Sequence, residues 1–450
     1  MSLSAQTYWA EHAWLNGTVE SGVLVGTATS GHITSVRPGE PAPPAGAVTL
    51  RGLTVPGLAN AHSHFFHRAL RATTQIGGGT FWTWREAMYH IADRLTPDYC
   101  FELARAVYAE MVLAGITCVG EFHYVHHAPG GHPYPNPNAV GEALIAAAAE
   151  AGLRITLLDT CYLSSGFGEP PTRQQLRFSD GDVDAWAERA AGLRPDATTR
   201  IGAAIHSVRA VPAEALGVVA RWARDRRAPL HLHLSEQPAE NDGCRRAHGR
   251  TPTRLLADHD VLGPQTTAVH ATHLTEEDID LLGGSATRVC LCPTTERDLA
   301  DGIGPASRLR RAGSPLCLGS DSHAMIDLFA EARGIELHER LRTRTRGHFT
   351  AAQLLRTATE QGHAALGWPE GGRLESGALA DFTTIALDSP RTAGPPARFG
   401  AETAVYAATS ADVRHTVVAG RHVVRDGAHQ LVHDLAGSLG RTVADLRHSP

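Results

Sequence analysis

Eight short apolar runs recur along the central part of the chain, and a helical pattern follows most of them. The runs cover residues 55–62, 116–122, 154–160, 200–206, 229–235, 267–272, 288–293 and 315–321. They are apolar through their length, as expected for strands that are buried on both faces. Strands that alternate with helical crossovers in this number predict an α/β fold, a closed parallel (β/α)8 barrel of the TIM type.

The two ends of the chain have a different pattern, made of short strands and turns. Residues 1–55 contain SGVLVGTATSGHITSVRPGE, and residues 377–450 contain GALADFTTIAL and RHTVVAGRHVVRDG, which predicts a hairpin with glycine at its turn. Neither end has enough apolar residues to fold alone. We therefore expect a small β-sandwich domain built from 1–55 plus 377–450, with a C-terminal helix over HDLAGSLGRTVADLR, and a barrel over 56–376.

Composition excludes several classes of partner. The net charge is −6 and no basic block occurs, which argues against nucleic acid and anionic membrane surfaces. No run of about 18 apolar residues is present, so no transmembrane helix is expected. The N-terminus lacks the pattern of a signal peptide. Seven scattered cysteines without a C-x-x-C pair are typical of a reducing cytoplasm, and we expect a cytoplasmic protein.

The chain contains no lysine, so all 41 basic residues counted as Lys+Arg are arginine. This excludes Schiff-base and pyridoxal-phosphate chemistry on a lysine, and it excludes a P-loop. It also excludes a two-metal site bridged by a modified lysine. Histidine is abundant instead, at 26 residues.

Ionisable residues close several of the apolar runs, at the end of the barrel where active sites lie. His62 and His64 end the first run and share one face of the strand, because residues i and i+2 point the same way. Alone, this pair fits two core histidines as well as it fits a metal site. With His233 after strand five and Asp321 after strand eight, it makes a set that suits zinc, or iron or manganese. His231 lies one layer deeper, and we expect it to support the ligands.

Two further residues are candidates for proton transfer. Glu236 lies three residues past His233, where a carboxylate can take a proton from a metal-activated water and pass it to a leaving amine. The alternative is a glutamate on a surface loop. His270 on strand six is expected to polarise or hold the attacked group, and the alternative is a buried core histidine.

These residues together resemble the amidohydrolase superfamily, in its single-metal deaminase branch. The H-x-H, the H-x-x-E after strand five, the histidine on strand six and S-D-S-H after strand eight occur in order over nearly the whole chain. Within that branch the chain is similar to the deiminases that act on N-formimino-L-glutamate. The segments that carry this similarity are FWTWREAMYHIADRLTP (81–97), GEFHYVHH (120–127), HSVRAVP (206–212) and HLHLSEQPAENDGC (231–244).

The resemblance implies a reaction, a cofactor and a set of roles. N-formimino-L-glutamate would be hydrolysed to N-formyl-L-glutamate and ammonia, a step of histidine degradation, by a homodimer with one Zn²⁺ per chain. The zinc ligands would be His62, His64, His233 and Asp321, and proton transfer would fall to Glu236, His270 and Asp321. The substrate-binding residues would be Arg85, Tyr124, His206 and Arg209.

The two arginines also make independent physical sense for a dicarboxylate substrate, because a guanidinium presents a planar fork that matches a carboxylate. Arg209 follows strand four by three residues, and Arg85 lies in an aromatic loop after strand one. The alternatives are solvated surface arginines and, for Tyr124, simple packing. His67 departs from the family, where glutamine is common at this position; a histidine there can still hydrogen-bond the substrate.

Two rival functions remain open at this stage. One is another single-metal deaminase acting on a guanine-like or adenosine-like ring, for which we would expect an aromatic pocket lined by amides rather than one with paired arginines. The other is a barrel that has lost catalysis and serves as a binding protein. The presence of all four ligands and of Glu236 argues against the second. The sequence does not decide the native metal, which arginine binds which carboxylate, or whether the 81–97 loop closes over the site.

Overall fold

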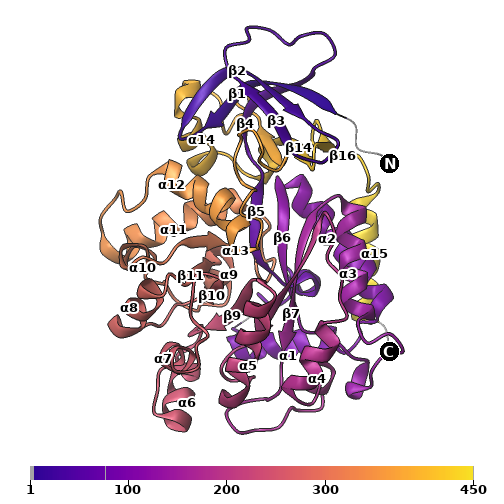
Figure 1. Cartoon of the computed structure of the whole chain (residues 1–450), viewed down its shortest axis with the longest axis vertical. Coiled ribbons are helices and arrows are strands. Elements are labelled where there is room, and N and C mark those ends of the chain that lie inside the picture. Colours follow the sequence, from indigo (N-terminus) through magenta and orange to yellow (C-terminus); the bar gives the residue numbers. More distant parts are fainter. Residues whose placement is uncertain (1–4, 77, 449–450) are drawn as a thin grey trace.

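Eight parallel strands form a barrel in the computed structural model, which describes residues 5–76 and 78–448 (Figure 1). The strand order β12-β11-β10-β9-β8-β7-β6-β5 follows the chain in reverse without a break. The strands are β5 (Leu58–Ser63), β6 (Ile116–His123), β7 (Arg154–Cys161), β8 (Thr199–Ile205), β9 (Leu230–Leu234), β10 (Thr266–His270), β11 (Arg288–Leu291) and β12 (Leu316–Leu318). All eight predicted runs are barrel strands, so the predicted fold class is confirmed.

The strands consist of apolar runs because both of their faces are covered. Every residue of β5, β6 and β7 is buried, between the barrel interior on one side and the helices on the other. The barrel closes between its first and last strands through a bridge between Ser63 and Asp321. There the Asp321 backbone N–H donates to the His62 carbonyl (3.0 Å), and the His64 N–H donates to the Asp321 carbonyl (3.3 Å).

Helices follow the strands and cover the outside of the barrel. Their bounds are α1 (Phe81–Ala92), α2 (Pro97–Leu113), α3 (Ala139–Ala151), α4 (Val183–Ala190), α5 (Ala213–Asp225), α6 (Pro238–His248), α7 (Pro252–Asp258), α8 (Glu276–Gly284), α9 (Pro293–Asp298), α10 (Ala306–Ala312), α11 (Leu328–Thr343), α12 (Ala351–Arg356) and α13 (Gly362–Ala365). Short helical turns lie between them: η1 (Phe65–Leu70), η2 (Pro129–Gly131), η3 (Gln175–Phe178) and the π-helical η4 (Thr357–Gln361). Helix α1 lies at the end of the barrel that is remote from the terminal sheet (Figure 1).

Both chain termini contribute to a second sheet of eight strands, in the order β16-β15-β14-β13-β4-β1-β2-β3. These strands are β1 (Gln6–Leu15), β2 (Thr18–Thr27), β3 (Ile33–Arg37), β4 (Val48–Pro56), β13 (Phe382–Ile385), β14 (Val413–Val418), β15 (Arg421–Arg425) and β16 (Ala428–His429). The C-terminal part also holds η5 (Ala397–Phe399), α14 (Gly400–Tyr406) and η6 (Ser410–Asp412).

This terminal sheet folds back on itself, as a sandwich requires. Tyr8 pairs with Val48 and Phe382 pairs with Pro56, eight positions further along β4. In a flat strand those positions lie about 26 Å apart. The Tyr8 and Phe382 rings nevertheless pack with their centroids 5.1 Å apart, so the sheet bends until its two halves meet. The pairing of β1 with β4 also shifts register between Ala10 and His12.

The C-terminal part of the chain contains the predicted hairpin and the predicted terminal helix. The hairpin β14–β15 turns at Ala419 and Gly420, both with positive φ, which suits a tight two-residue turn. The predicted terminal helix is α15 (Leu435–His448), and it packs against α2 of the barrel rather than against the sheet (Figure 1). The proposed domain boundaries at 55/56 and 376/377 stay predictions.

All seven cysteines are free and buried. Among residues 5–76 and 78–448, no helix has both the length and the apolar character that crossing a membrane demands.

Candidate metal centre and active site

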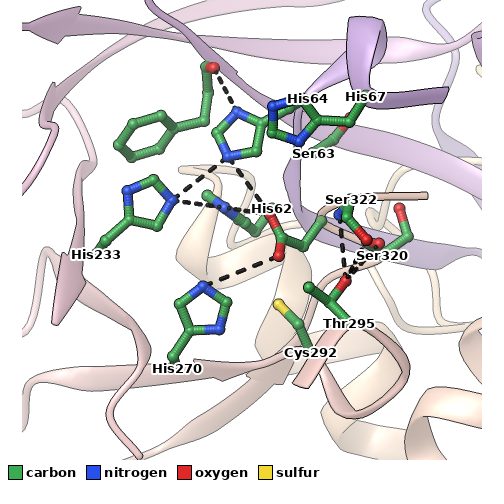
Figure 2. Close-up of polar contacts among 12 residues, drawn as sticks. His62, Ser63, His64, His67, His233, His270, Cys292, Thr295, Ser320 and Ser322 are labelled. Atoms are coloured by element: carbon green, nitrogen blue, oxygen red, sulfur yellow. Dashed lines mark hydrogen bonds and ion pairs between the residues drawn. The ribbon is translucent and has the colours of Figure 1, made fainter. Parts of the chain in front are cut away.

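Three imidazoles and one carboxylate converge at the open end of the barrel, where β5, β9 and β12 end (Figure 2). Their ligand atoms all lie within 4.8 Å of one another. The His233 Nε2 lies 3.1 Å from His62 Nε2 and 3.4 Å from His64 Nε2. The Asp321 Oδ1 lies 3.2 Å from His62 Nε2 and 3.4 Å from His64 Nε2. The structure therefore brings together the four residues that the sequence predicted as metal ligands.

The spacing and protonation of these groups fit a metal ion. Tetrahedral ligands at zinc distances of 2.0–2.1 Å lie about 3.4 Å from each other, close to the separations observed. His64 Nδ1 donates to the Phe122 carbonyl (3.0 Å), and His233 Nδ1 donates to the His206 carbonyl (2.9 Å). Because both Nδ1 atoms carry the proton, two Nε2 lone pairs face each other. A cation between them turns this repulsion into attraction.

The protonation preferences of the ligands agree with this assignment. Burial lowers the pKa of His64 and of His233 well below the usual value, so both imidazoles are neutral at pH 7. Burial alone would raise the pKa of Asp321, but the hydrogen bond with His62 and the positive charge of the nearby His270 hold that pKa well below its usual range. Neutral imidazoles and an ionised carboxylate are the forms that bind a metal.

Glu236 and His270 lie beside the predicted ligands. The Glu236 Oε1 is 3.7 Å from His270 Nε2, and the Asp321 Oδ2 is 3.9 Å from the same nitrogen. Burial raises the pKa of Glu236, which suits a group that must both take up and release a proton. Burial alone would lower the pKa of His270, but the charges of Glu236 and Asp321 and the hydrogen-bonding contact with Glu296 outweigh it and raise that pKa well above its usual value. The set can therefore combine a base with a cationic donor.

The backbone at three of these strand ends has an uncommon conformation. Ser235, His270 and Asp321 have φ values of 51°, 67° and 45°, in the left-handed region that few non-glycine residues adopt. Each of them ends or follows a barrel strand and turns the chain abruptly at the barrel mouth. Such strain clusters at functional sites, where the surrounding structure holds it in place.

A cavity opens above the predicted metal ligands. Its walls contain every predicted site residue except His62, which lies beneath them: His64, His67, Arg85, Tyr124, His206, Arg209, His233, Glu236, His270 and Asp321. The remaining walls are mainly aromatic and apolar: Phe81, Trp84, Met88, Tyr89, Tyr162, Phe178 and Leu299. The two arginines predicted for a dicarboxylate thus share one chamber with the metal ligands.

Arg209 is held in the cavity wall by an ion pair. Its Nε donates to Glu240 Oε2 (3.0 Å), and Glu240 Oε1 accepts from the Ser235 backbone N–H (3.2 Å). Only 13% of the Arg209 side chain is exposed. Burial alone would lower the pKa of Arg209, but the neighbouring carboxylates of Glu240 and Glu236 raise it, so the guanidinium stays charged. Glu240 leaves the terminal nitrogens for a ligand and joins Arg209 to the turn that carries Glu236.

Arg85 lies on helix α1 and not in the loop that the sequence predicted, since Thr80 caps a helix there. Hydrogen bonds connect Arg85 to the segment after β7. Its Nε donates to the Tyr89 hydroxyl (2.6 Å), and its guanidinium lies 5.2 Å from the centroid of the Tyr89 ring. The buried Gln175 amide donates to both the Tyr89 hydroxyl (3.0 Å) and the Tyr162 hydroxyl (2.7 Å). These hydrogen bonds fix the position of the Arg85 guanidinium at the cavity.

His67, Tyr124 and His206 lie between the ligands and the arginines. The Tyr124 hydroxyl is 3.1 Å from His67 Nε2, and the His206 ring lies 5.4 Å from the Tyr124 ring. Burial lowers the pKa of His67 to about 3, so it is neutral at pH 7. Its Nδ1 has no partner among the described residues, which leaves it available to a ligand. His231 is not a ligand: its Nε2 donates to the Ala365 carbonyl (2.9 Å) at a deeper level.

Some cavity residues were not anticipated. Tyr162 directly follows strand β7, so the strand-end rule that found the ligands could have found it too. Tyr89 and Trp84 are on α1, beside the predicted Arg85. Gln175 has no signal in the sequence, because a single glutamine at the start of a short helical turn predicts neither burial nor contact.

The sequence and the fold were compared with those of known proteins. The model of the amidohydrolase family matches residues 53–423. The formimidoylglutamate deiminase of Pseudomonas aeruginosa is 35% identical over 435 residues, which cover 94% of this chain and 95% of that protein. The 8-oxoguanine deaminase of the same organism is 30% identical over 398 residues, covering 87% of this chain and 86% of that protein. The crystal structure of an amidohydrolase from Brucella melitensis superposes with a TM-score of 0.90 at 32% identity, covering 98% of this chain and 100% of that chain.

Proposed function

This chain belongs to the amidohydrolase family, and from that premise we propose that it hydrolyses N-formimino-L-glutamate to N-formyl-L-glutamate and ammonia. The observation that carries the proposal is the content of one cavity. Three of the four predicted metal ligands and Glu236 share its walls with two guanidinium groups, Arg85 and Arg209. The substrate has the complementary layout, with a reactive formimino carbon and two carboxylates on one short molecule.

The reaction needs a nucleophile, a base and a place for the leaving amine. A divalent metal, for which we propose zinc, would supply Lewis acidity when held by His62, His64, His233 and Asp321. Glu236 takes one proton from the attacking water as its oxygen bonds to the formimino carbon. Protonated His270 donates toward the atoms on which negative charge develops. Glu236 returns its proton to the formimino nitrogen, Asp321 takes the second water proton and passes it to the same nitrogen, the C–N bond breaks, and ammonia leaves.

The arginines act on the far part of the substrate. Each guanidinium can form two parallel hydrogen bonds to one carboxylate, which fixes the direction of the substrate in the chamber. Tyr124, His206 and His67 line the space between the charged groups and Glu236. Holding both ends places the formimino carbon against the water and reduces the entropy that the reaction must otherwise lose.

A purine-type deaminase is the second candidate, and one observation favours it. Six aromatic rings line the cavity (Phe81, Trp84, Tyr89, Tyr124, Tyr162 and Phe178), and a purine ring could stack on them. The 8-oxoguanine deaminase relative is consistent with that reading. A neutral purine base has no anionic group for Arg85 and Arg209, however, and removing water from their guanidinium groups without an anionic ligand is costly.

Ammonia release decides between these candidates. The purified protein, with its metal content measured, is assayed on N-formimino-L-glutamate, formiminoglycine, guanine and adenosine. We expect kcat/KM to be highest for formiminoglutamate and about 10- to 100-fold lower for formiminoglycine, which lacks one carboxylate. A higher kcat/KM for guanine or adenosine contradicts the proposal. Metal analysis of the same sample identifies the bound metal and so tests the proposal that it is zinc. The homodimer and the cytoplasmic location stay predictions, and sedimentation analysis tests the first.

A further inference from the structure

Three of the four predicted metal ligands lie beside the seam between β5 and β12 that closes the barrel. His62 and His64 belong to β5, and Asp321 follows β12, which is only three residues long. The backbone bonds across this seam are those of Asp321 with the His62 carbonyl and the His64 N–H, described above. A seam with so little backbone pairing needs side chains to keep His62, His64 and Asp321 at ligating distance.

Glu121 supplies that support from the next strand, β6. Its side chain is completely buried. The Oε1 accepts from the Phe65 backbone N–H (2.9 Å), and the Oε2 accepts from the Ser63 hydroxyl (2.8 Å). Ser63 and Phe65 are the residues on either side of His64. One carboxylate therefore holds the backbone before and after a predicted metal ligand, while the neighbouring Phe122 carbonyl holds the ring of that ligand.

The support continues across the seam. The Ser63 Oγ also lies 3.0 Å from Nε2 of His323, a buried residue two positions after Asp321. The carbonyl of His323 in turn accepts from Arg71 Nε (2.6 Å). Glu121, Ser63 and His323 thus form a continuous path from β6, over the end of β5, to the segment that carries Asp321. Figure 2 shows Ser63 beside His64 in this part of the site.

We propose that Glu121 is a positioning residue that sets the geometry of the metal centre by holding the ends of β5 and β12 together. It does not touch the metal site itself and acts through Ser63, Phe65 and His323. Some groups orient metal ligands without contacting the metal, and removing such a group lowers metal affinity by about 10- to 100-fold. The inference concerns the metal centre and does not depend on which substrate the protein hydrolyses.

The test measures zinc affinity of the metal-free protein by competition with a chromogenic chelator. We expect Glu121→Ala to raise the Kd for Zn²⁺ by about 10- to 100-fold. Glu121→Gln keeps an acceptor for Phe65 and a polar partner for Ser63, so its Kd should stay within about threefold of the original value. The matched control is Glu336→Ala, since Glu336 is also buried and accepts from two backbone N–H groups, those of Gly347 and Phe349 (both 2.8 Å), in another part of the fold.

Several results would overturn the proposal. One is a Glu121→Ala protein that is folded by circular dichroism and has a Kd for Zn²⁺ within threefold of the original value. Another is a Glu121→Gln protein whose Kd rises as much as that of Glu121→Ala. The third is an equal rise in Kd in Glu336→Ala. If Glu121→Ala does not fold, Ser63→Ala decides, because it removes only the hydroxyl that joins Glu121 to His323. A rise in Kd of more than threefold then supports the proposal, and a smaller change refutes it.

Discussion

At the scale of single residues, the predicted metal centre depends on which ring nitrogen carries the proton. His64 and His233 are each oriented by a backbone carbonyl at Nδ1, at 3.0 Å and 2.9 Å. A carbonyl can only accept, so the hydrogen bond fixes the tautomer and presents Nε2 to the metal position. The strand ends therefore supply both the ligand and the group that orients it, because Phe122 and His206 end or follow barrel strands themselves.

A prediction at this scale concerns Glu236. Glu236→Gln preserves the size of the side chain but removes its ability to take a proton. We expect kcat to fall by about 10²- to 10⁴-fold, the usual contribution of a general acid or base, with metal content unchanged. Steady-state kinetics and metal analysis of the same preparation measure both quantities. A variant with near-normal kcat would show that another group moves the proton.

At the scale of elements, α1 forms the cover of the cavity. Thr80 caps the helix through its side chain, which accepts from the Thr83 N–H (3.4 Å), so the helix begins at Phe81. Arg85, Met88 and Tyr89 then face the cavity from successive turns of one helix face. Before the helix, the Gln75 amide donates to Asp298 (3.0 and 2.8 Å), which joins the loop after β5 to α9 on another side of the mouth.

The hydrogen bond between α1 residues gives a second prediction. Tyr89→Phe removes the hydroxyl that accepts from Arg85 Nε and from Gln175. Losing one such hydrogen bond to a charged group costs about 1.5 kcal/mol or more, so we expect KM for N-formimino-L-glutamate to rise roughly tenfold with kcat nearly unchanged. Tyr99→Phe on α2, outside the cavity, is the control. An unchanged KM would mean that Arg85 keeps its position without Tyr89.

The contact between α9 and α11 gives a prediction about pH. Glu331 on α11 is fully buried and accepts from the Thr294 N–H (2.9 Å), and burial raises its pKa from 4.5 to about 8. The folded protein then binds a proton that the unfolded chain releases at pH values between these two. Its contribution to stability is complete below pH 4.5 and is lost as the pH rises toward 8, with a slope of up to about 1.4 kcal/mol per pH unit.

Urea unfolding of the original protein and of Glu331→Gln at pH 5, 6, 7 and 8 measures this slope. The difference between the two proteins isolates Glu331, because the other titrating groups are common to both. We expect the free energy of unfolding of the original protein to decline relative to that of Glu331→Gln over this range. Parallel curves would show that Glu331 is ionised in the folded state.

At the scale of the whole molecule, a buried ion pair joins the barrel to the terminal sheet. Arg154 at the start of β7 donates to both oxygens of Asp381 (2.6 and 3.3 Å), and the Ala419 N–H donates to Asp381 as well (2.6 Å). Both side chains are at most 3% exposed. The Arg154 guanidinium also lies 5.2 Å from the centroid of the Trp368 ring. The segments that contain Arg154, Asp381 and Ala419 thus meet at one buried ion pair.

Breaking this pair should be costly. Asp381→Ala leaves the Arg154 charge buried without its partner, and we expect the free energy of unfolding to fall by about 3–5 kcal/mol. The control is Asp388→Ala, which breaks a solvent-exposed pair with Arg414 and should cost less than about 1 kcal/mol. Urea unfolding followed by circular dichroism measures both. Equal losses in the two variants would contradict a special role for the buried pair.

Sequence alone was sufficient where a local pattern carries the information. The eight barrel strands were predictable because each is a short apolar run between helical patterns, and parallel strands bring their carboxyl ends to one edge. That rule put His62, His64, His233 and Asp321 together before any distance was known. The same rule did not find Gln175, because the residues next to it in the sequence give no sign that its amide donates to Tyr89 and Tyr162.

What the sequence determined by itself is the barrel and the group of strand-end residues at its mouth, because residue spacing along a strand or helix decides which side chains share a face. Only the tertiary structure decided that the terminal sheet folds until Tyr8 meets Phe382, and that α15 packs on α2. The same holds for Glu121, which supports His64 from a neighbouring strand. Those contacts join residues far apart in the chain, and their partners are chosen by packing, which no local pattern records.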